Sequence, residues 1–316
     1  MSSATGSEDY QRETGLTRAA RRAARRLSAL PALFTFTVDV EDHGSARARD
    51  QTERLLDLLE EAGALGTFFV LDDVARHEPG LVAEIARRGH EVASHGHAHR
   101  PLAEEGPDRF RSGMDAARDR LADLTGIAPV GFRAPYFALT PAAAWAPGIL
   151  AELGFAYSSS VLPAWNPLAG WPGAPRRPFL WPSGVLELPV PVARIGPVRL
   201  PFLGGMYLRW LPPWRLRGLA DRWAAEEAAG GALWSYCHPY DLDESEGLSL
   251  RPDAGAIGSL MLWLNRGPTL PRLTGLLHGR RSVPFADRLD ALRPGAAAWP
   301  RQVSTTAERG LGRRHG

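Results

Sequence analysis

The stretch "GTFFVLDDVARHEPGLVAEIARRGHEVASH", residues 66–95, alternates strand-like and helix-like segments. "GTFFVL" (66–71) and "HEVASH" (90–95) are short runs typical of strands. Between them, "GLVAEIARRG" (80–89) reads as a helix that ends at a glycine. This order predicts two parallel strands joined by a helix on the outside of the sheet.

The same alternation extends on both sides of this stretch. We expect further strands at 33–40, 130–135, 155–160, 185–190 and 232–239, and further helices at 51–63, 107–126, 142–154 and 214–230. A Pro-rich insertion at 162–184 interrupts the rhythm. The pattern predicts an α/β fold, a β/α barrel or a variant of one, in a single domain at 31–285. Residues 1–30, with an Arg-rich helix at 16–30, and residues 286–316 are expected to be flexible tails.

Composition excludes several classes of protein. The 316 residues carry a net charge of only +2, every basic side chain is arginine, and no nucleic-acid motif is present, so we expect no nucleic-acid partner. Cys237 is the single cysteine, so no internal disulfide is possible. The start is polar and no run reaches the roughly 18 apolar residues of a membrane span, which favours a cytoplasmic protein. The Arg-rich segment suits a solvated flanking helix or weak contact with a membrane surface.

Polar residues gather where the expected strands end. They are Asp39 to His43, His95 to His99, Arg133 to Tyr136, Ser158 to Ser160, and His238. In β/α barrels the chemistry lies at the carboxyl ends of the strands. The sequence therefore predicts a site built from these groups.

The residue types at these strand ends suit a metal. His95 and His99 can converge if the chain turns after His95, and neutral imidazoles bind zinc, cobalt or nickel. "VDVED" (38–42) supplies carboxylates, of which Asp39 and Glu41 share a face of the strand. Two histidines and one carboxylate leave open positions for water and substrate, and a remaining carboxylate can act as general base. A hydrated polar loop and a surface turn are the alternatives.

In this order the motifs resemble those of the polysaccharide deacetylases with a NodB-homology domain, carbohydrate esterase family four. The matching segments are "TVDVED" (37–42), "GHEVASHGHAH" (89–99), "GFRAPYF" (131–137), "FAYSSSV" (155–161) and "LWSYCHP" (233–239). The chain is most similar to a bacterial branch associated with exopolysaccharide gene clusters and exosortase systems. The resemblance implies a distorted (β/α)7-type barrel of the NodB type.

The resemblance also implies an activity. It is metal-dependent hydrolysis that removes N-acetyl groups from an amino sugar in a bacterial glycan or glycan precursor. The implied cofactor is one divalent metal, zinc first, with cobalt, nickel or manganese as alternatives. Hydrolysis of a non-sugar C–N bond, as in allantoinase-like relatives, and an inactive glycan-binding role remain open.

Metal and base roles carry over from the family by position. His95 and His99 match its metal-binding histidines. The family has two adjacent carboxylates, the first the catalytic base and the second a metal ligand. Asp39 is favoured as the base and Asp42 as the ligand, while another alignment matches Glu41 and Asp42 to the adjacent pair.

The remaining roles also follow from the resemblance. Arg133 matches the arginine that pairs with the catalytic carboxylate, and His238 matches the general acid. Pro135 and Tyr136 match the pocket wall, and the backbone N–H at Tyr136 matches the oxyanion donor.

The chain departs from the family pattern at one place. Ser158 stands where the fourth motif commonly has an aspartate, so a carboxylate near the late histidine is missing. Asp241 or Asp243 is the expected replacement, and otherwise His238 is less well tuned.

Other candidates are assigned weaker roles. His97 is expected to be a bystander or a substrate contact, and His90 a structural hydrogen-bonding residue. Trp165, Trp171 and Trp181 in the insertion suit sugar stacking or core packing equally.

Overall fold

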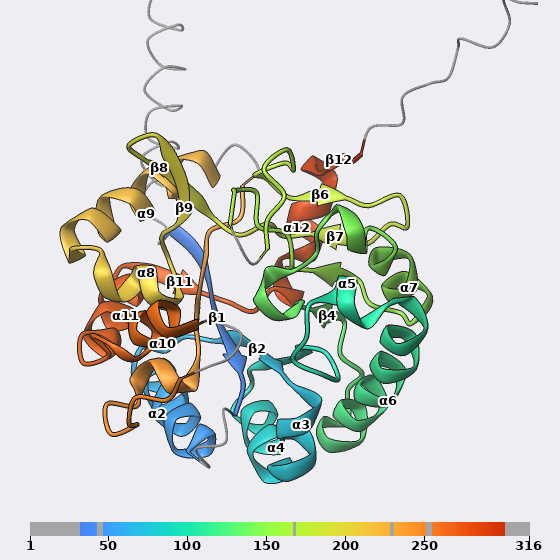
Figure 1. Ribbon diagram of the computed structural model, residues 1–316, viewed down its shortest axis with the longest axis horizontal. Coiled ribbons are helices and arrows are strands. Elements are labelled where there is room, and N and C mark those ends of the chain that lie inside the picture. Colours follow the sequence, from blue (N-terminus) through green and yellow to red (C-terminus); the bar gives the residue numbers. More distant parts are fainter. Residues whose placement is uncertain (1–31, 43–46, 167–168, 228–230, 251–254, 301–316) are drawn as a thin grey trace, which may run out of the picture.

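The chain folds around one curled sheet whose strands are mostly parallel (Figure 1). This computed structural model describes residues 32–42, 47–166, 169–227, 231–250 and 255–300. The Arg-rich segment at 16–30 therefore lies outside the described residues. Within the described part of the chain, no helix has the length and apolar character needed to cross a bilayer.

The strand order confirms the predicted α/β fold. Neighbours in the sheet are β10 (Trp234–Cys237), β1 (Ala32–Val40), β2 (Gly66–Val70), β3 (Glu91–Ser94), β4 (Gly131–Phe132), β5 (Tyr157–Ser158), β7 (Leu186–Glu187), β6 (Phe179–Leu180) and β12 (Ala297–Ala298). Of these pairs only β6 and β7 are antiparallel, and β11 (Arg280–Ser282) pairs with the first half of β1. The sheet curls into a half-barrel, as the NodB-like fold requires.

Helices surround the sheet, and most of those in the first half of the chain, coloured blue to green in Figure 1, follow one another around it in chain order. The first half contributes α2 (Ala48–Glu61), α3 (Asp72–His77), α4 (Pro79–Arg87), α5 (Leu102–Glu105), α6 (Pro107–Thr125) and α7 (Ala146–Glu152). The second half contributes α8 (Gly205–Trp210), α9 (Pro213–Glu227), α10 (Gly255–Trp263), α11 (Thr269–Leu277) and α12 (Leu289–Leu292). The α6 helix ends at Gly126, whose φ of 74° terminates the helix in the left-handed conformation.

The residues of β1 explain how the fold positions a site. Phe34, Phe36, Val38 and Val40 belong to the core cluster that also contains the apolar residues of α2, α4 and α9. Because side chains alternate along a strand, Thr35, Thr37, Asp39 and Glu41 point to the other side, into the half-barrel. All four are buried. One strand thus presents an apolar face to the helices and a polar face to the interior.

An aromatic layer fills the interior below these polar residues. Phe69, Tyr157, Trp234 and Phe285 form it, with ring centroids 5.6 Å apart for Tyr157 and Phe285 and 5.8 Å apart for Trp234 and Phe285. Phe285 follows β11 in the chain, so the C-terminal part of the domain closes the lower end of the half-barrel.

The C-terminal boundary predicted at residue 285 is wrong, because residues 286–300 are folded. Arg288 is buried, and its Nη1 donates to Thr35 Oγ1 (3.0 Å) and to the Leu233 carbonyl oxygen (3.2 Å). The β12 strand pairs with β6, and the Trp299 ring packs on Trp171 with centroids 4.7 Å apart. These contacts are all long-range, so the Ala- and Pro-rich composition of the segment did not reveal them.

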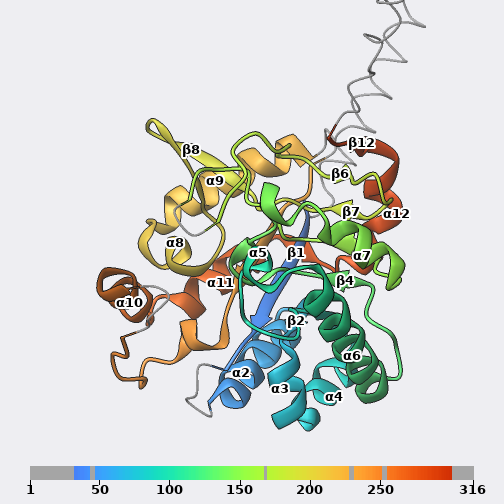
Figure 2. The same cartoon turned by 45° about the vertical axis from the view of Figure 1, so that its right-hand side comes forward.

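A hairpin that the sequence did not predict lies between the two ends of the sheet. It consists of β8 (Val192–Ile195) and β9 (Val198–Pro201), and Figure 2 shows it projecting beyond α9. The chain before it is joined to β10, because Trp234 Nε1 donates to the Pro189 carbonyl oxygen (3.2 Å). After it, Gly204 bridges to Tyr236 of β10. Long-range contacts rather than a regular strand therefore complete this wall.

Candidate metal centre and catalytic site

The predicted site residues meet at one edge of the sheet. Asp39 and Glu41 come from the end of β1, His95 directly follows β3, Arg133 follows β4 and His238 follows β10. These strands are neighbours or near neighbours in the sheet and run parallel, so their carboxyl ends lie together. The five side chains are mostly buried, from Arg133 at 0% exposure to His238 at 14%.

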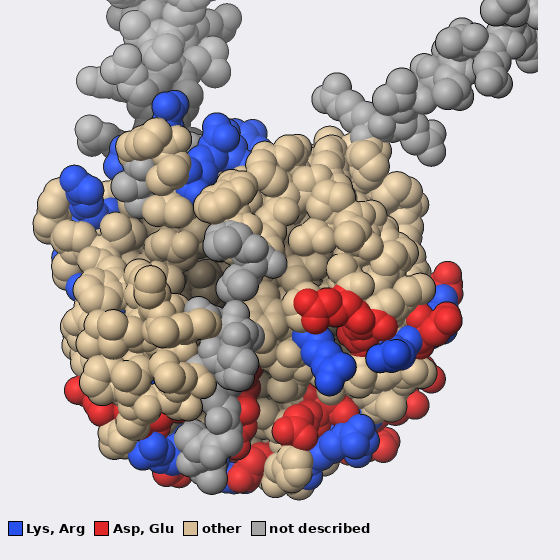
Figure 3. Space-filling view, in the orientation of Figure 1, with Lys and Arg blue, Asp and Glu red and all other residues tan. Residues whose placement is uncertain are grey.

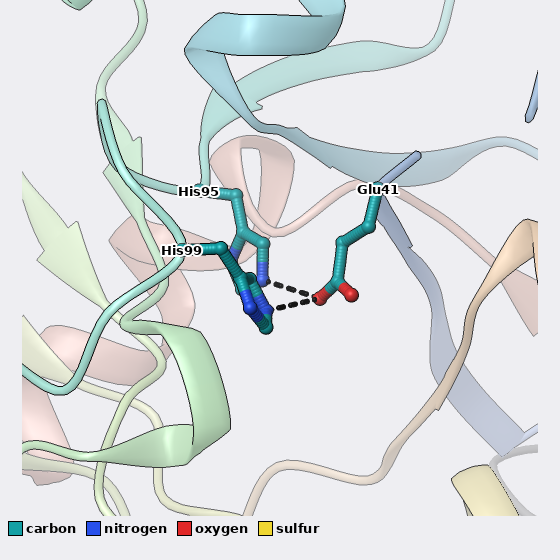
Figure 4. Close-up of side chains that lie close together, drawn as sticks. All are labelled: Glu41, His95 and His99. Atoms are coloured by element: carbon teal, nitrogen blue, oxygen red, sulfur yellow. Dashed lines mark hydrogen bonds and ion pairs between the residues drawn. The ribbon is translucent and has the colours of Figure 1, made fainter. Parts of the chain in front are cut away.

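Glu41, His95 and His99 form one compact cluster (Figure 4). Glu41 Oε1 lies 2.9 Å from His95 Nε2 and 3.0 Å from His99 Nε2. The predicted carboxylate ligand, Asp42, is not part of the cluster and its side chain is exposed. The alternation along β1 gives the reason, because Asp39 and Glu41 face the interior and the next residue faces away. The structure thus corrects Asp42 to Glu41 as the carboxylate beside the two histidines.

The chemistry of these donors fits a cation. His95 Nδ1 lies 3.0 Å from the Arg133 carbonyl oxygen, which only accepts, so the proton of a neutral His95 ring is on Nδ1. The lone pair of His95 Nε2 then faces a carboxylate oxygen, and two acceptors this close need a proton or a metal ion between them. Glu41, His95 and His99 each offer one ligand atom, and these atoms all lie within 4.8 Å of one another, so the three residues could together hold one cation.

A tight turn brings His99 back toward His95. Gly96 has a φ of 96°, which side-chain-bearing residues rarely adopt. Downstream of it, the His99 ring lies 5.8 Å from the His95 ring and 4.5 Å from the Tyr136 ring. The turn therefore lets two histidines four residues apart approach the same carboxylate oxygen.

The other two histidines near this loop have structural surroundings. His97 Nδ1 lies 2.8 Å from Glu105 Oε1, and the His97 ring packs so closely on Gly113 that a Cβ there would lie 2.2 Å from it. His90 Nδ1 accepts a hydrogen bond from the Gly66 N–H (3.1 Å), and burial lowers the pKa of His90 to about 4. The structural role predicted for His90 matches this geometry, and His97 is a bystander to the cluster.

Asp39 is held by Arg133, as predicted. Arg133 Nη1 donates to Asp39 Oδ1 (2.6 Å) and to Thr37 Oγ1 (2.7 Å), and its Nη2 donates to Ser159 Oγ (3.0 Å). The guanidinium carbon lies 3.9 Å from the centroid of the Phe69 ring. Burial lowers the pKa of Arg133 and the charge of Asp39 opposes that effect. Asp39 Oδ1 is therefore fixed, and Oδ2 is directed toward the site.

His238 stands across the site from the metal cluster. Its Nε2 lies 3.9 Å from Asp39 Oδ2, and its ring stacks on Tyr240 with centroids 4.5 Å apart. Its Nδ1 lies 2.9 Å from Asp241 Oδ2, which also accepts from the His238 backbone N–H. Burial opposes a positive charge on this ring, but the bond to Asp241 and the nearby carboxylates together raise the pKa of His238 to about 9.

Of the two acids expected to replace the family aspartate, the structure places Asp241 on His238. Asp243 instead pairs with Arg47 Nε (3.0 Å) and accepts from Ser245. The Asp241 carboxylate is buried, and Arg209 Nε lies 3.5 Å from its Oδ1. Sequence reasoning missed Arg209, because nothing in "GGMYLRW" (204–210) marks it.

Ser158 and the buried Glu187 beside it bind the turn that follows β5. Ser158 Oγ donates to Ser160 Oγ (2.8 Å), and Glu187 Oε1 accepts from the backbone N–H groups of Ser160 (2.7 Å) and Val161 (2.8 Å). Glu187 Oε2 accepts from Trp181 Nε1 (3.1 Å). The acid next to Ser158 therefore fixes the turn after β5 and does not reach His238. Sequence reasoning also missed Glu187.

The remaining predicted residues fall into two groups. Pro135 is buried, and Tyr136 has a φ of 58°, so both belong to a sharp turn beside His99. Among the insertion tryptophans, Trp181 is 4% exposed and packs on Trp171 and Trp299. Trp165 is 75% exposed. Two of the three are therefore explained by packing.

Two family descriptions match the chain. "Polysaccharide deacetylase" matches residues 33–157, and "Domain of unknown function (DUF3473)" matches residues 159–290. Their boundary falls at Ser158 in β5, in the interior of the 10-stranded sheet. The first match contains Glu41, His95, His99, Asp39 and Arg133, and the second contains His238.

The curated relatives each match about a quarter of this chain. A peptidoglycan-N-acetylglucosamine deacetylase of Bacillus cereus is 34% identical over 85 residues, which are 27% of this chain and 31% of the relative. The peptidoglycan-N-acetylglucosamine deacetylase PgdA of Listeria monocytogenes is 32% identical over 88 residues, 28% of this chain and 19% of the relative. The chain thus spans less than a third of the length of these relatives.

Solved structures with the same fold cover most of the chain. A putative polysaccharide deacetylase from Mycobacterium smegmatis aligns with a TM-score of 0.56 at 22% identity, covering 84% of this chain and 91% of that one. The Puue allantoinase aligns with a TM-score of 0.57 at 15% identity, covering 83% and 90%. At these identities the likeness shows the fold alone. The motifs and the match over residues 33–157 identify this part of the chain as a polysaccharide deacetylase domain.

Proposed function

We propose that this protein is a metal-dependent hydrolase that removes N-acetyl groups from an amino sugar in a bacterial glycan or glycan precursor. The observation that carries the proposal is the Glu41–His95–His99 cluster, with Asp39 and His238 beside it. The cluster offers two imidazole nitrogens and one carboxylate, a donor set that suits zinc, with cobalt, nickel or manganese as alternatives. The deacetylases of N-acetylglucosamine among its relatives support the substrate class.

Asp39 is the general base in this scheme. Arg133 holds its Oδ1, so Oδ2 is the oxygen that accepts a proton from a water molecule. The resulting hydroxide adds to the carbonyl carbon of the acetamide. A divalent cation held by Glu41, His95 and His99 would polarise the acetamide carbonyl and lower the pKa of water in the site.

His238 is the general acid. The ring proton on Nε2 is available because Asp241 holds Nδ1 and favours the imidazolium form. His238 transfers that proton to the sugar nitrogen as the C–N bond breaks, and the products are acetate and a free amine. By family position, the backbone N–H of Tyr136 donates to the oxyanion and Pro135 lines the pocket.

The second half of the chain supports a finer choice of substrate. Residues 159–290 supply His238 and Asp241 and match a domain of unknown function, and the motifs of the chain resemble those of the exopolysaccharide-associated branch. We therefore include an exopolysaccharide, or a precursor of one, as the glycan. A cytoplasmic location is part of the proposal, and cell fractionation followed by immunoblotting tests it.

Metal content and acetate release test the proposal together. Purified wild type is expected to hold about one equivalent of a divalent transition metal and to release acetate from N-acetylglucosamine oligomers. His95→Ala should lose both, whereas His77→Ala, at an exposed histidine of α3, should keep both. A wild-type protein that stays empty in added zinc and cobalt would reject a metal hydrolase and leave a glycan-binding protein. Hydrolysis of allantoin without acetate release would show that the substrate carries a non-sugar C–N bond and is not an N-acetylated sugar.

A further inference from the structure

One face of the molecule carries arginines that form no ion pair with a carboxylate in the described part of the chain. Five exposed arginines lie on the β8–β9 hairpin and α9, namely Arg194, Arg199, Arg215, Arg217 and Arg222. None of them forms an ion pair with another described residue, whereas Arg49, Arg87 and Arg88 elsewhere each pair with a glutamate. In Figure 3 blue side chains gather at the upper left, over the hairpin and α9, with no red among them. We call this the arginine face.

A groove on the arginine face concentrates this charge. It has a volume of about 320 Å³ and is lined by Arg194, Trp214, Arg215, Leu219 and Arg222, among others. Among the described residues, no carboxylate lines it. The backbone orients two of the cations, since Arg194 Nε donates to the Gly196 carbonyl oxygen (3.2 Å) and Arg222 Nε to the Gly218 carbonyl oxygen (3.1 Å). Like charges held this close repel one another, so an anionic partner would be favoured there.

Large apolar side chains stand out of the same side of the molecule. Trp214 is 68% exposed, Val198 at the hairpin turn 49%, and Trp210 at the end of α8 47%. The adjoining α10 exposes Ile257 (77%) and Leu260 (42%). Arg209 joins α8 to α10, because its Nη1 donates to the Leu262 carbonyl oxygen (2.7 Å). Exposed tryptophan and aliphatic side chains beside arginines are the composition of a membrane-interface surface.

We propose that the arginine face and the apolar side chains next to it dock on a bilayer that contains anionic lipids. Each arginine near an anionic leaflet contributes attraction, and the apolar side chains enter the headgroup region. A free phosphate would occupy the groove but would not use Val198, Trp210 or Ile257, which lie outside its lining. The spread of charge and apolar surface over the hairpin, α8, α9 and α10 therefore favours a lipid surface over a small anion.

The docking surface adjoins the proton-donor side of the site through α8. Arg209 of α8 contacts Asp241, and Asp241 holds His238. Docking itself does not depend on the proposed hydrolase activity.

Vesicle sedimentation tests the proposal with a charge-matched control. Full-length wild type should sediment with phosphatidylcholine vesicles containing phosphatidylglycerol and not with pure phosphatidylcholine. The variant with Arg194→Ala, Arg215→Ala and Arg222→Ala should bind about a hundredfold more weakly, at about fivefold for each arginine near the surface. The control with Arg109→Ala, Arg176→Ala and Arg281→Ala removes the same charge at exposed positions elsewhere and should bind nearly as wild type.

Two further measurements decide between a lipid surface and other readings. Trp214→Ser leaves the charge unchanged and should weaken vesicle binding, while thermal unfolding and acetate release from a soluble substrate stay as in wild type. Equal binding by the two triple variants, or no sedimentation of wild type, would overturn the proposal. Stabilisation of wild type by inorganic phosphate, with vesicle binding unaffected by Trp214→Ser, would show a small-anion groove instead.

Discussion

The two sides of the site are built in different ways. Glu41, His95 and His99 each lie within five residues of the end of a regular strand in the first half of the chain. His238 also follows a strand, but its support comes from Asp241 in a 3-10 turn and from Arg209 in α8. Arg209 is in turn held by the carbonyl oxygens of Leu262 and Leu264 (2.7 and 3.1 Å). Short β-α units thus position the metal side, whereas contacts between distant segments position the proton donor.

The Glu41–His95–His99 cluster should lose its metal when its one carboxylate is changed. Glu41→Gln removes the oxygen that lies between two imidazoles, so metal content and acetate release should both fall by more than the tenfold to hundredfold typical of a supporting residue. Asp42→Asn alters the exposed neighbour and should keep both. Elemental analysis and acetate assays on the two purified variants distinguish them. The reverse result would restore Asp42 as the ligand.

The choice between Glu41 and Asp42 shows how much of the site could be predicted from the sequence. The alternation of "FTFTVDVE" (34–41) predicts that Asp39 and Glu41 share a face, and the structure confirms it. The favoured ligand was nevertheless Asp42, because the family motif has adjacent carboxylates and this chain has a valine between Asp39 and Glu41. The pattern along the strand was more reliable than the spacing in the family motif.

The second half was less predictable for a physical reason. Strands β6 and β12, which the sequence did not predict, are two residues long and lie in Pro-rich and Ala-rich stretches that carry no periodic signal. Glu187, Arg209 and Trp299 act through partners that are distant in sequence or lie outside regular elements. No local pattern reports such contacts. The short spacing in "HPYD" (238–241) was the exception, and it identified Asp241 as one of two candidates.

The proton-donor side should weaken without losing metal. Asp241→Asn removes the carboxylate charge that lies beside His238 Nδ1. Acetate release should therefore fall about tenfold to a hundredfold, while metal content is unchanged. Asp241 helps to raise the pKa of His238 to about 9, so its loss should move the alkaline limb of the kcat/KM profile to lower pH. Asp243→Asn, whose carboxylate pairs with Arg47 instead, is the matched control and should leave that limb in place. An unchanged alkaline limb in Asp241→Asn would remove Asp241 from the scheme.

The C-terminal segment should contribute to stability and not to chemistry. Trp299 packs on Trp171, Trp181 and Phe179 with centroids 4.7 to 5.5 Å apart. Because Trp299 is only half-buried, Trp299→Ala should lower the free energy of unfolding by about 2 kcal/mol, less than a fully buried aromatic residue. Urea denaturation measures this, with acetate release unchanged below the transition. Trp165→Ala, at a 75% exposed tryptophan, should change stability little. Equal stabilities for the two variants would show that residues 286–300 do not contribute to the stability of the domain.

The smallest expected effect concerns a histidine of the regular half. Burial, with a smaller contribution from Arg88, lowers the pKa of His90 from 6.5 to about 4, so the folded protein prefers the neutral ring. The stabilising effect of His90 is therefore fully present above pH 6.5 and is lost as the pH falls through about 4. His90→Asn keeps an acceptor for the Gly66 N–H and does not titrate. Wild type should lose about 1 to 2 kcal/mol relative to His90→Asn across this range, measured by urea denaturation at several pH values. Parallel stability curves for the two proteins would show that His90 titrates alike in the folded and unfolded chains, and that its burial costs the charged form little.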